Sequence, residues 1–238
     1  RTALKQLEYA TMTPIQAASL PILLNGHDLI AQAKTGSGKT AAFAISLLTN
    51  LNPRRFAVQA MVLCPTRELA EQVTQEIRRL ARFEDNIKVL SLCGGTPIGP
   101  QRNSLEHGAH IVVGTPGRLM DHLERGSLRL DALNTLVLDE ADRMLDMGFY
   151  DDIVVVAEHC PVRRQTMLFS ATYPEGIAKL ANQFLRNPQE VKLLEQHENS
   201  KIRQRFYEVK HEERLQAVAT LLKHYRPIST LAVCNTKR

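Results

Sequence analysis

Tryptophan is absent from the chain, and phenylalanine and tyrosine bring its aromatic content to only 5%. A broad aromatic platform on which nucleic-acid bases stack is therefore excluded as its main binding surface. No apolar stretch is long enough to cross a bilayer, so we expect no membrane association. The four cysteines lie far apart, with no Cys-x-x-Cys pair and no Cys/His cluster at zinc spacing, so we expect no structural metal.

Size, charge and cysteine placement set broad limits on the protein class. The 238 residues suffice for one large domain, or for one domain and part of another, and a hydrophobic content of 44% supports a packed core. The formal net charge of +5 is compatible with a polyanionic partner without establishing one. Cys64 and Cys93 each end an apolar run, which favours buried, reduced thiols and a cytoplasmic protein. A monomer is expected.

A glycine-rich segment at residues 34–40 has the pattern of a phosphate-binding loop. Its glycines let backbone N–H groups turn toward phosphate oxygens, Lys39 would reach the β- and γ-phosphates, and the Thr40 hydroxyl would bind Mg²⁺. Where the usual pattern opens with glycine, this chain has Ala33. An ordinary glycine-rich turn is the alternative, but an apolar strand at 28–33 and an apolar helix at 40–48 favour the loop. The expected ATP contacts are Ala33, Lys34, Thr35, Gly36, Ser37, Gly38, Lys39 and Thr40.

Two adjacent carboxylates, Asp139 and Glu140, follow an apolar strand about a hundred residues later. The end of a buried parallel strand is where such a sheet presents groups to ligands. We therefore predict that Asp139 holds Mg²⁺, directly or through water, and that Glu140 is the base that orients the attacking water. The alternative is a helix N-terminus enriched in acidic residues for electrostatic reasons. Lys39, Asp139 and Glu140 are the predicted catalytic residues.

Short apolar runs alternate with amphipathic helical patterns through most of the chain, which predicts an α/β fold with a mostly parallel sheet flanked by helices. The strands after residue 50 are predicted at 59–64, 87–92, 110–114, 135–139, 166–170 and 191–194. The helices in that region are predicted at 67–83, 97–107, 116–124, 149–159 and 174–185. After a polar linker at 196–204 come a strand-like 206–210, a helix-like 212–225 and an apolar 231–234.

The phosphate loop, residues 139–142 and Ser170-Ala171-Thr172 together resemble the DEAD-box family of ATP-dependent RNA helicases, whose four-letter name residues 139–142 spell out. The resemblance covers nearly the whole chain and implies a RecA-like domain that binds ATP, Mg²⁺ and RNA. Among bacterial members the chain most resembles the DbpA type, which acts on ribosomal RNA, at residues 64–67 and 92–95.

Three further segments resemble the RNA-contacting elements of that family. Each follows or flanks a predicted strand end, where hydroxyls, backbone N–H groups and a guanidinium can hold a sugar-phosphate chain without reading bases. Taken singly, each segment is better explained as a helix cap or a turn, and only the coordinated set favours RNA contact. The expected RNA contacts are Pro65, Thr66, Arg67, Gly94, Gly95, Thr115, Pro116, Gly117 and Arg118.

Residues 13–16 resemble the family's adenine-recognising glutamine motif. The Gln16 amide places a donor beside an acceptor, which matches the N6 and N7 edge of adenine and selects ATP over GTP. A polar residue in the first turn of a helix is the alternative. Thr13 and Tyr9 are expected to contribute to ATP binding, and the resemblance implies a further aromatic residue before Arg1 that stacks on adenine.

Asp142, Ser170 and Thr172 form the predicted coupling set. The resemblance implies that the two hydroxyls hydrogen-bond Asp142 and link the nucleotide state to domain closure. Capping of the following helix is the alternative, and both roles are compatible.

The predicted organisation is an N-terminal RecA-like ATP-binding domain at 1–195, a linker at 196–204 and the beginning of a second RecA-like domain at 205–238. The resemblance implies that the second domain supplies an arginine finger, a group worth about 10³–10⁵ in rate in related enzymes. We therefore expect the 238 residues alone to hydrolyse ATP weakly and to unwind no RNA.

The predicted function is an RNA-stimulated ATPase that locally unwinds RNA duplexes, in ribosome assembly or RNA remodelling. An ATP-gated RNA clamp or assembly scaffold, without productive unwinding, is the second hypothesis. A small-molecule kinase is a third, and Gln16 and residues 170–172 argue against it.

Overall fold

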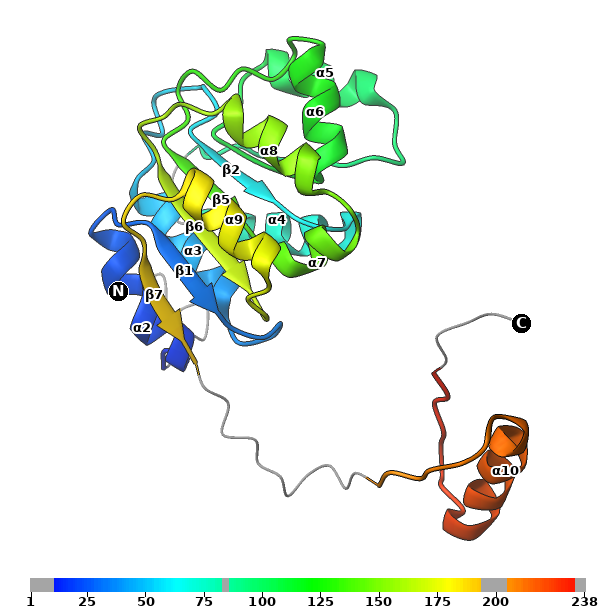
Figure 1. The fold of residues 1–238 in the computed structure, drawn as a ribbon. Helices are drawn as coiled ribbons and strands as arrows, with labels where there is room; N and C mark the ends of the chain where they lie inside the picture. The colour runs from blue at the N-terminus through cyan, green and yellow to red at the C-terminus, as the bar shows by residue number, and fades with distance from the viewer. Residues whose placement is uncertain (1–10, 83–85, 194–204, 234–238) are drawn as a thin grey trace. The chain divides into compact units, whose positions relative to one another are not determined.

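The computed structural model describes residues 11–82, 86–193 and 205–233, and the chain divides into two compact units, residues 1–194 and 195–238. Tyr9, the linker at 196–204 and Cys234 lie outside the described residues. Strands and helices alternate through the first unit (Figure 1). Its elements are α2 (Pro14–Leu24), β1 (Leu29–Gln32), α3 (Lys39–Thr49), β2 (Ala60–Leu63), α4 (Arg67–Ala81), β3 (Val89–Leu92), α5 (Ile98–Glu106), β4 (Ile111–Gly114), α6 (Pro116–Glu124), β5 (Thr135–Leu138), α7 (Ala141–Asp146), α8 (Tyr150–Glu158), β6 (Gln165–Ser170), α9 (Glu175–Phe184) and β7 (Gln189–Lys192).

The strands form one seven-stranded parallel sheet in the order β3-β4-β2-β5-β6-β1-β7. The register aligns the carboxyl ends of neighbouring strands, because Leu63 lies between Gly114 and Leu138, and Gln32 pairs with Ser170. The loops that follow these strands therefore meet at a single edge of the sheet. The predicted parallel α/β fold is confirmed, and each predicted strand of the first unit overlaps an observed one.

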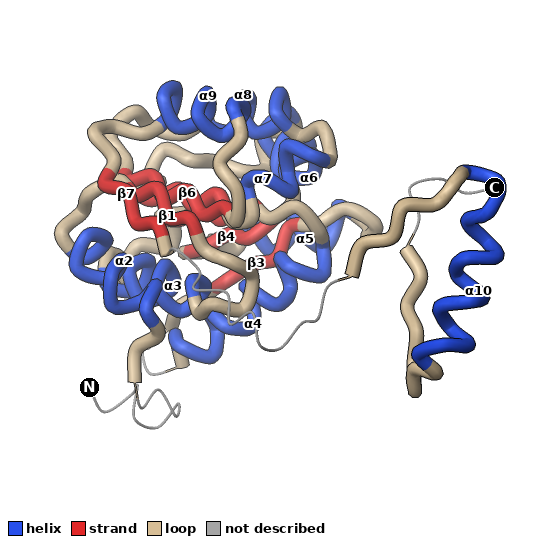
Figure 2. The backbone as a smooth tube through the Cα atoms, turned by 60° about the horizontal axis from the view of Figure 1, so that its bottom comes forward, coloured by secondary structure: helices blue, strands red, loops and turns tan. Residues whose placement is uncertain are grey.

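Helices cover both faces of the sheet, with α2, α3 and α4 on one side and α6, α7, α8 and α9 on the other (Figure 2). Each face has its own hydrophobic core. In β6, Met167 and Phe169 pack into the core under α2, α3 and α4, while Leu168 packs into the core under α6, α7, α8 and α9. Because both faces are covered, the strands read as nearly continuous apolar runs rather than as alternating patterns.

Three features differ from the sequence prediction. α2 and the six-residue α7 were not among the predicted helices, and α7 begins directly after Glu140. The strand predicted at 206–210 is wrong, because these residues form no strand in the described part of the second unit. A strand requires a hydrogen-bonded neighbour, and no described segment pairs with this one. The helix predicted at 212–225 is present as a 3₁₀ turn (His211–Glu213) followed by α10 (Arg214–Tyr225).

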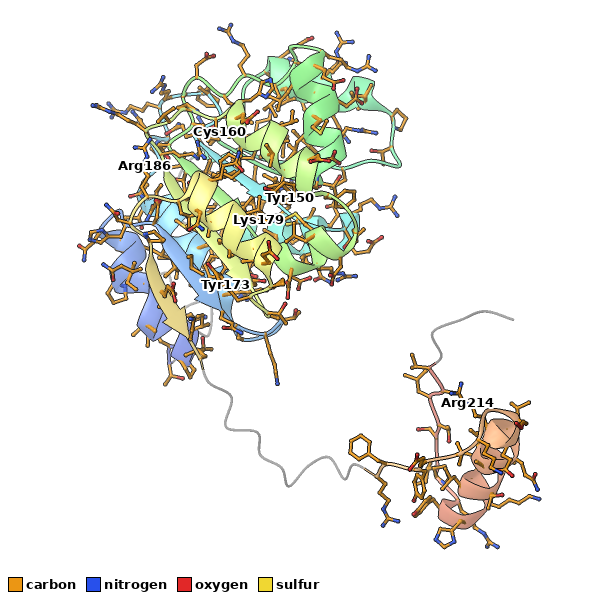
Figure 3. All side chains as sticks on the ribbon, in the orientation of Figure 1. Tyr150, Cys160, Tyr173, Lys179, Arg186 and Arg214 are labelled. Atoms are coloured by element: carbon orange, nitrogen blue, oxygen red, sulfur yellow. The ribbon has the colours of Figure 1, made fainter. Side chains whose placement is uncertain are left out.

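Three cysteines, Cys64, Cys93 and Cys160, are free and buried, as predicted for the first two. Cys160 follows the end of α8 (Figure 3), and burial raises the pKa of its thiol to about 12. Such a thiol stays protonated at neutral pH and is a poor nucleophile. Over the ranges that the structure covers, no helix combines the length and the apolar character needed to cross a membrane.

Candidate functional site

The phosphate-loop sequence forms the turn between β1 and α3. Gly36 and Gly38 have positive φ angles of 80° and 92°, a conformation that favours glycine. A Cβ atom at Gly38 would lie 2.7 Å from Gln16 Nε2 and 2.9 Å from Thr13 Oγ1, so the position has no room for a side chain. Gly38 is also the N-cap of α3, which directs the positive end of that helix into the loop.

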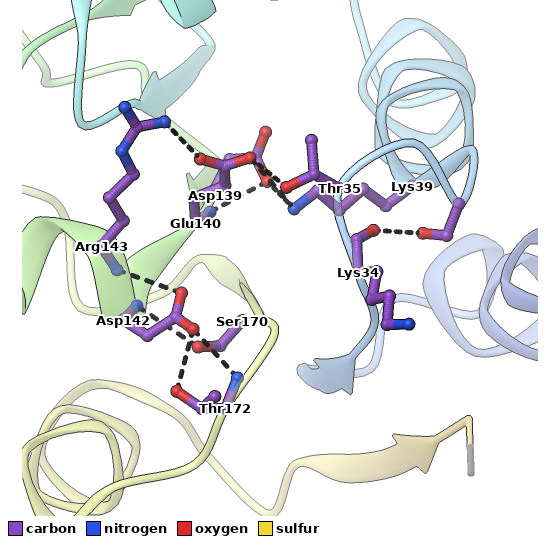
Figure 4. Close-up of polar contacts among 10 residues, drawn as sticks. Lys34, Thr35, Lys39, Asp139, Glu140, Asp142, Arg143, Ser170 and Thr172 are labelled. Atoms are coloured by element: carbon purple, nitrogen blue, oxygen red, sulfur yellow. Dashed lines mark hydrogen bonds and ion pairs between the residues drawn. The ribbon is translucent and has the colours of Figure 1, made fainter. Parts of the chain in front are cut away.

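Lys39, the first residue of α3, meets the acidic pair that follows β5 (Figure 4). Lys39 Nζ lies 3.2 Å from Asp139 Oδ1 and 3.9 Å from Glu140 Oε1, and all three side chains are buried. Only β6 separates β1 from β5 in the sheet, which brings loops a hundred residues apart to one place. The three residues predicted to be catalytic therefore lie next to one another.

Glu140 is held by two partners that the sequence did not indicate. Thr35 Oγ1 donates a hydrogen bond of 2.7 Å to Glu140 Oε1, and Arg143 Nη1 lies 3.4 Å from Oε2. Glu140 also has a left-handed backbone, with φ 51° and ψ 50°, which is strained for a residue with a side chain. The strained turn directs two successive carboxylates into the same site.

The buried carboxylate of Asp139 is suited to a cation. Burial raises the pKa of Asp139, and the nearby Lys39 ammonium only partly opposes that effect. Among the buried side-chain atoms described, Asp139 Oδ2 and Lys39 Nζ make no hydrogen bond, and Lys39 has only its ion pairs. The free acceptor, Asp139 Oδ2, fits a bound Mg²⁺, and the free donor, Lys39 Nζ, fits phosphate oxygens beside it. Thr40, half-buried in the first turn of α3, adds a hydroxyl.

Asp142 connects the acidic loop to the end of β6. The backbone N–H and the Oγ1 hydroxyl of Thr172 each donate a hydrogen bond of 2.9 Å to Asp142 Oδ2. Ser170 Oγ accepts from the Asp142 backbone N–H at 3.3 Å. Burial alone would raise the pKa of Asp142, but the hydrogen bonds with Thr172, Ser170 and the Arg143 backbone together outweigh it, and the pKa is lowered. Asp142, Ser170 and Thr172 therefore act as one hydrogen-bonded unit.

The start of α2 packs on the phosphate loop. Gln16 Nε2 donates to the Gly38 carbonyl at 3.0 Å, and Gln16 Oε1 accepts from the Thr13 backbone N–H at 3.0 Å. The buried Gln16 amide thus touches the loop directly, a contact that the sequence did not indicate. The amide retains a second N–H and a second lone pair for a further partner.

The predicted RNA contacts occupy the other half of the same sheet edge. They follow β2, β3 and β4, which are consecutive neighbours in the sheet, whereas the phosphate loop, the acidic pair and the coupling residues Ser170 and Thr172 lie at the ends of β1, β5 and β6. Thr66 caps α4 by accepting from the Leu69 N–H at 3.2 Å, and Arg67 Nη1 lies 3.1 Å from the position of a Cβ on Gly95. Gly94, Thr115 and Gly117 remain accessible. Pro65 and Pro116 are buried, and their contact with RNA stays a prediction.

The Arg118 side chain is bonded within the protein. Its side chain is only 13% exposed, and its guanidinium donates to Gln101 Oε1 at 3.1 Å and to the Thr96 carbonyl at 2.9 Å. Gln101 also donates to the Cys93 carbonyl at 3.0 Å. This arrangement links Arg118 to the glycine loop, and its contact with RNA stays a prediction.

The network extends to a buried histidine, His122 on α6. Its Nε2 lies 2.9 Å from Gln101 Oε1 and its Nδ1 lies 2.8 Å from Ser127 Oγ. Because the Gln101 oxygen can only accept, Nε2 carries the proton, and Nδ1 of the neutral ring can only accept. Nδ1 then shares the single Ser127 hydroxyl proton with the His122 carbonyl oxygen, 3.1 Å from Ser127 Oγ. Burial, reinforced by Arg118, lowers the pKa of His122, which agrees with a neutral ring. Gln101 and His122 are site residues that no sequence motif marked.

A family model for DEAD/DEAH box helicases matches residues 13–180. The chain is 54% identical to the ATP-dependent RNA helicase DbpA of Escherichia coli over 237 residues, which cover 100% of this chain and 52% of that protein. It is 42% identical to the DEAD-box ATP-dependent RNA helicase CshA of Bacillus subtilis, covering 99% of this chain and 48% of that protein. The crystal structure of a DEAD box protein from Methanococcus jannaschii superposes with a TM-score of 0.78 at 41% identity, covering 93% of this chain and 60% of that one. The chain therefore spans about half the length of these curated relatives.

Proposed function

Because the chain belongs to the DEAD/DEAH box helicase family, we propose that it provides the nucleotide-binding half of an ATP-dependent RNA helicase. The carrying observation is the approach of Lys39 Nζ to Asp139 Oδ1 at 3.2 Å, with Glu140 beside it, at the end of a phosphate loop. Its relatives DbpA and CshA are named ATP-dependent RNA helicases, which supports the assignment.

In this proposal the phosphate-loop backbone and Lys39 bind the triphosphate, and Thr40 and Asp139 hold Mg²⁺. The metal would neutralise charge on the phosphates as it develops during cleavage. Glu140 accepts a proton from the attacking water and is oriented for this by Thr35 and Arg143. Gln16 would select adenine from its position against Gly38, and Thr13 and Tyr9 are proposed to contribute to ATP binding.

RNA would lie over the loops after β2, β3 and β4, beside the nucleotide on the same sheet edge. Thr66, Arg67, Gly94, Gly95, Thr115 and Gly117 would contact its backbone. The Asp142–Ser170–Thr172 unit lies in the nucleotide half, next to β5. It is the proposed link between ATP state and the closure of a second RecA-like domain that begins near residue 205. Closure over a bent strand would separate a short duplex locally.

Finer assignments follow from the likeness to DbpA at residues 64–67 and 92–95. We assign the protein to the cytoplasm, as a monomer, with ribosomal RNA as its target and ribosome assembly as its setting. An ATP-gated clamp without unwinding is the second candidate, because the same edge would hold RNA in either case. Strand separation by the whole protein, measured with a labelled duplex, distinguishes the two.

The test of the proposal is Glu140→Gln in the whole protein. Gln keeps an acceptor for Thr35 but removes the base, so RNA-stimulated ATP hydrolysis should fall about 10²- to 10⁴-fold while ATP binding is retained. Glu158→Gln, an exposed site at the end of α8, is the matched control and should leave the rate unchanged. Hydrolysis by the Glu140 variant within about twofold of wild type would contradict the assigned role.

A further inference from the structure

A hollow of about 770 Å³ lies at the opposite edge of the sheet from the nucleotide and RNA loops. Its walls are residues 55–58 ahead of β2, residues 105–109 ahead of β4 and residues 125–132 ahead of β5. All three segments precede strands, whereas the phosphate loop, the acidic pair and the proposed RNA contacts all follow strands. The hollow is within the size range of ligand sites in proteins.

Arginines dominate the charge of this hollow, which Arg55, Arg102, Arg125 and Arg129 line against Glu106 and Asp131. Arg129 pairs with Asp131 at 3.3 Å, and Arg125 pairs with Asp121 at 2.5 Å. Arg55 and Arg102 have no ion-pair partner within residues 11–82, 86–193 and 205–233. Their charges are therefore available to an anion.

An aromatic ring stands at the same hollow on a rigid support. Phe56 is 48% exposed, and its ring centroid lies 4.7 Å from that of the buried His110. His110 is fixed at both nitrogens, because Nδ1 accepts from the Lys88 N–H at 3.0 Å and Nε2 donates to the Pro53 carbonyl at 3.0 Å. Gly108, with φ 79°, would place a Cβ only 3.1 Å from the Phe56 backbone and side chain. The loop that carries Phe56 therefore packs closely against Gly108 and His110.

We propose that this hollow is a second RNA contact, in which one unpaired base stacks on Phe56 while Arg55 and Arg102 bind adjacent phosphates. An aromatic face beside unpaired arginines is the combination that binds single-stranded nucleic acid without reading its sequence. The proposal rests on the RNA-binding function proposed above and extends the footprint to the far edge of the sheet.

The path between the two contacts is defined by α5 and α6. α5 starts three residues after Gly95 and carries Arg102, while α6 starts directly after Thr115 and ends at the hollow. A nine-residue helix is about 13 Å long, so an RNA chain that leaves the first contact along these helices reaches the second within a few nucleotides. A short RNA would fill only the first contact, and a longer one would fill both.

The test compares single-stranded RNAs of about 6 and about 20 nucleotides, measured by fluorescence anisotropy on the whole protein with a nonhydrolysable ATP analogue. The double variant Arg55→Ala/Arg102→Ala and the single variant Phe56→Ala should each weaken binding of the longer RNA about tenfold and leave the shorter one unchanged. The double variant should also lower the dependence of log Kd on log salt concentration by about 1.4, since each phosphate contact contributes about 0.7. Glu106→Gln removes an opposing charge from the hollow and should strengthen binding of the longer RNA.

Arg163→Ala is the matched control, because Arg163 is exposed but does not line the hollow. Thermal melting checks that each variant is folded. If both RNAs bind and the variants hold the longer one within twofold of wild type, the second contact is refuted while the helicase assignment stands. If wild type binds neither RNA, both proposals fall. Equal losses for both RNA lengths would also overturn the second contact, since they place these residues in the first.

Discussion

Replacing Gln101 with leucine should weaken the support of the loop after β3 and of the start of α6. The substitution itself changes no residue that is proposed to contact RNA. The Gln101 side chain takes part in four hydrogen bonds, with the Cys93 carbonyl, Thr96 Oγ1, Arg118 and His122. Leucine has nearly the same shape but can make none of them. The substitution therefore separates hydrogen bonding from packing.

The expected loss follows from the surroundings of each partner. His122 is fully buried, so its Nε2–H group would lose its partner without gaining water, which costs about 1–3 kcal/mol. The remaining contacts are partly exposed and regain some hydration, so together they add about 1 kcal/mol. The free energy of unfolding should fall by about 2–4 kcal/mol. Because Gln101 joins the Gly95 loop to α6, RNA affinity should also fall while the ATP affinity stays near wild type.

Urea denaturation measures the first effect, and RNA and ATP titrations measure the second. Asn103→Leu is the control, since Asn103 is exposed on the same helix, and its effect on stability should stay within about 0.5 kcal/mol. A Gln101→Leu protein with unchanged stability would refute the assigned network. A parallel loss of ATP and RNA affinity would show general unfolding rather than misplaced RNA loops.

Two further substitutions test the sheet edge at other points. Gly114→Ala would place a Cβ 2.4 Å from the Leu92 carbonyl oxygen, so chemical denaturation should show a loss of about 1–3 kcal/mol or more, and a neutral effect would contradict the close strand contact. Thr172→Val removes one hydrogen bond to the Asp142 carboxylate and should raise the pKa of Asp142 toward its ordinary value, with Thr172→Ser as the conservative control. A carboxyl group with a lowered pKa in the folded state stabilises the fold at pH values above its pKa in the unfolded state. The Val variant should therefore be less stable by about 1 kcal/mol at pH 7. Thermal melting should show this difference in stability shrinking below about pH 4. A difference that does not change with pH would exclude the ionised carboxylate as its source.

The sequence predicted those parts of the fold that depend on residues close together in the chain. β2, β4 and β5 are buried on both faces, so their apolar runs were recognisable without any knowledge of their neighbours. The phosphate loop was predictable because its positive φ angles demand glycine at particular positions. The acidic pair was predictable because Asp139 and Glu140 directly follow a strand.

The parts that the sequence did not predict depend on contacts between distant segments. Gln101 and His122 lie 21 positions apart, and their bond exists only because α5 packs beside α6. Nothing local indicated that the Arg118 guanidinium would donate to Gln101 and to the Thr96 carbonyl. The strand expected at 206–210 had suitable residues but no paired neighbour among the described segments.

The strand order also determines when during folding the protein can first bind nucleotide. Lys39 and Asp139 come together only after β1, β6 and β5 have paired, and 100 positions separate the two residues along the chain. Parallel pairing of such remote segments is slow, because the chain loses the entropy of closing a long loop before stabilising contacts form. The protein should therefore gain affinity for ATP late in folding. A chain that has folded only its first strands and helices lacks Asp139 beside Lys39 and should not bind ATP tightly.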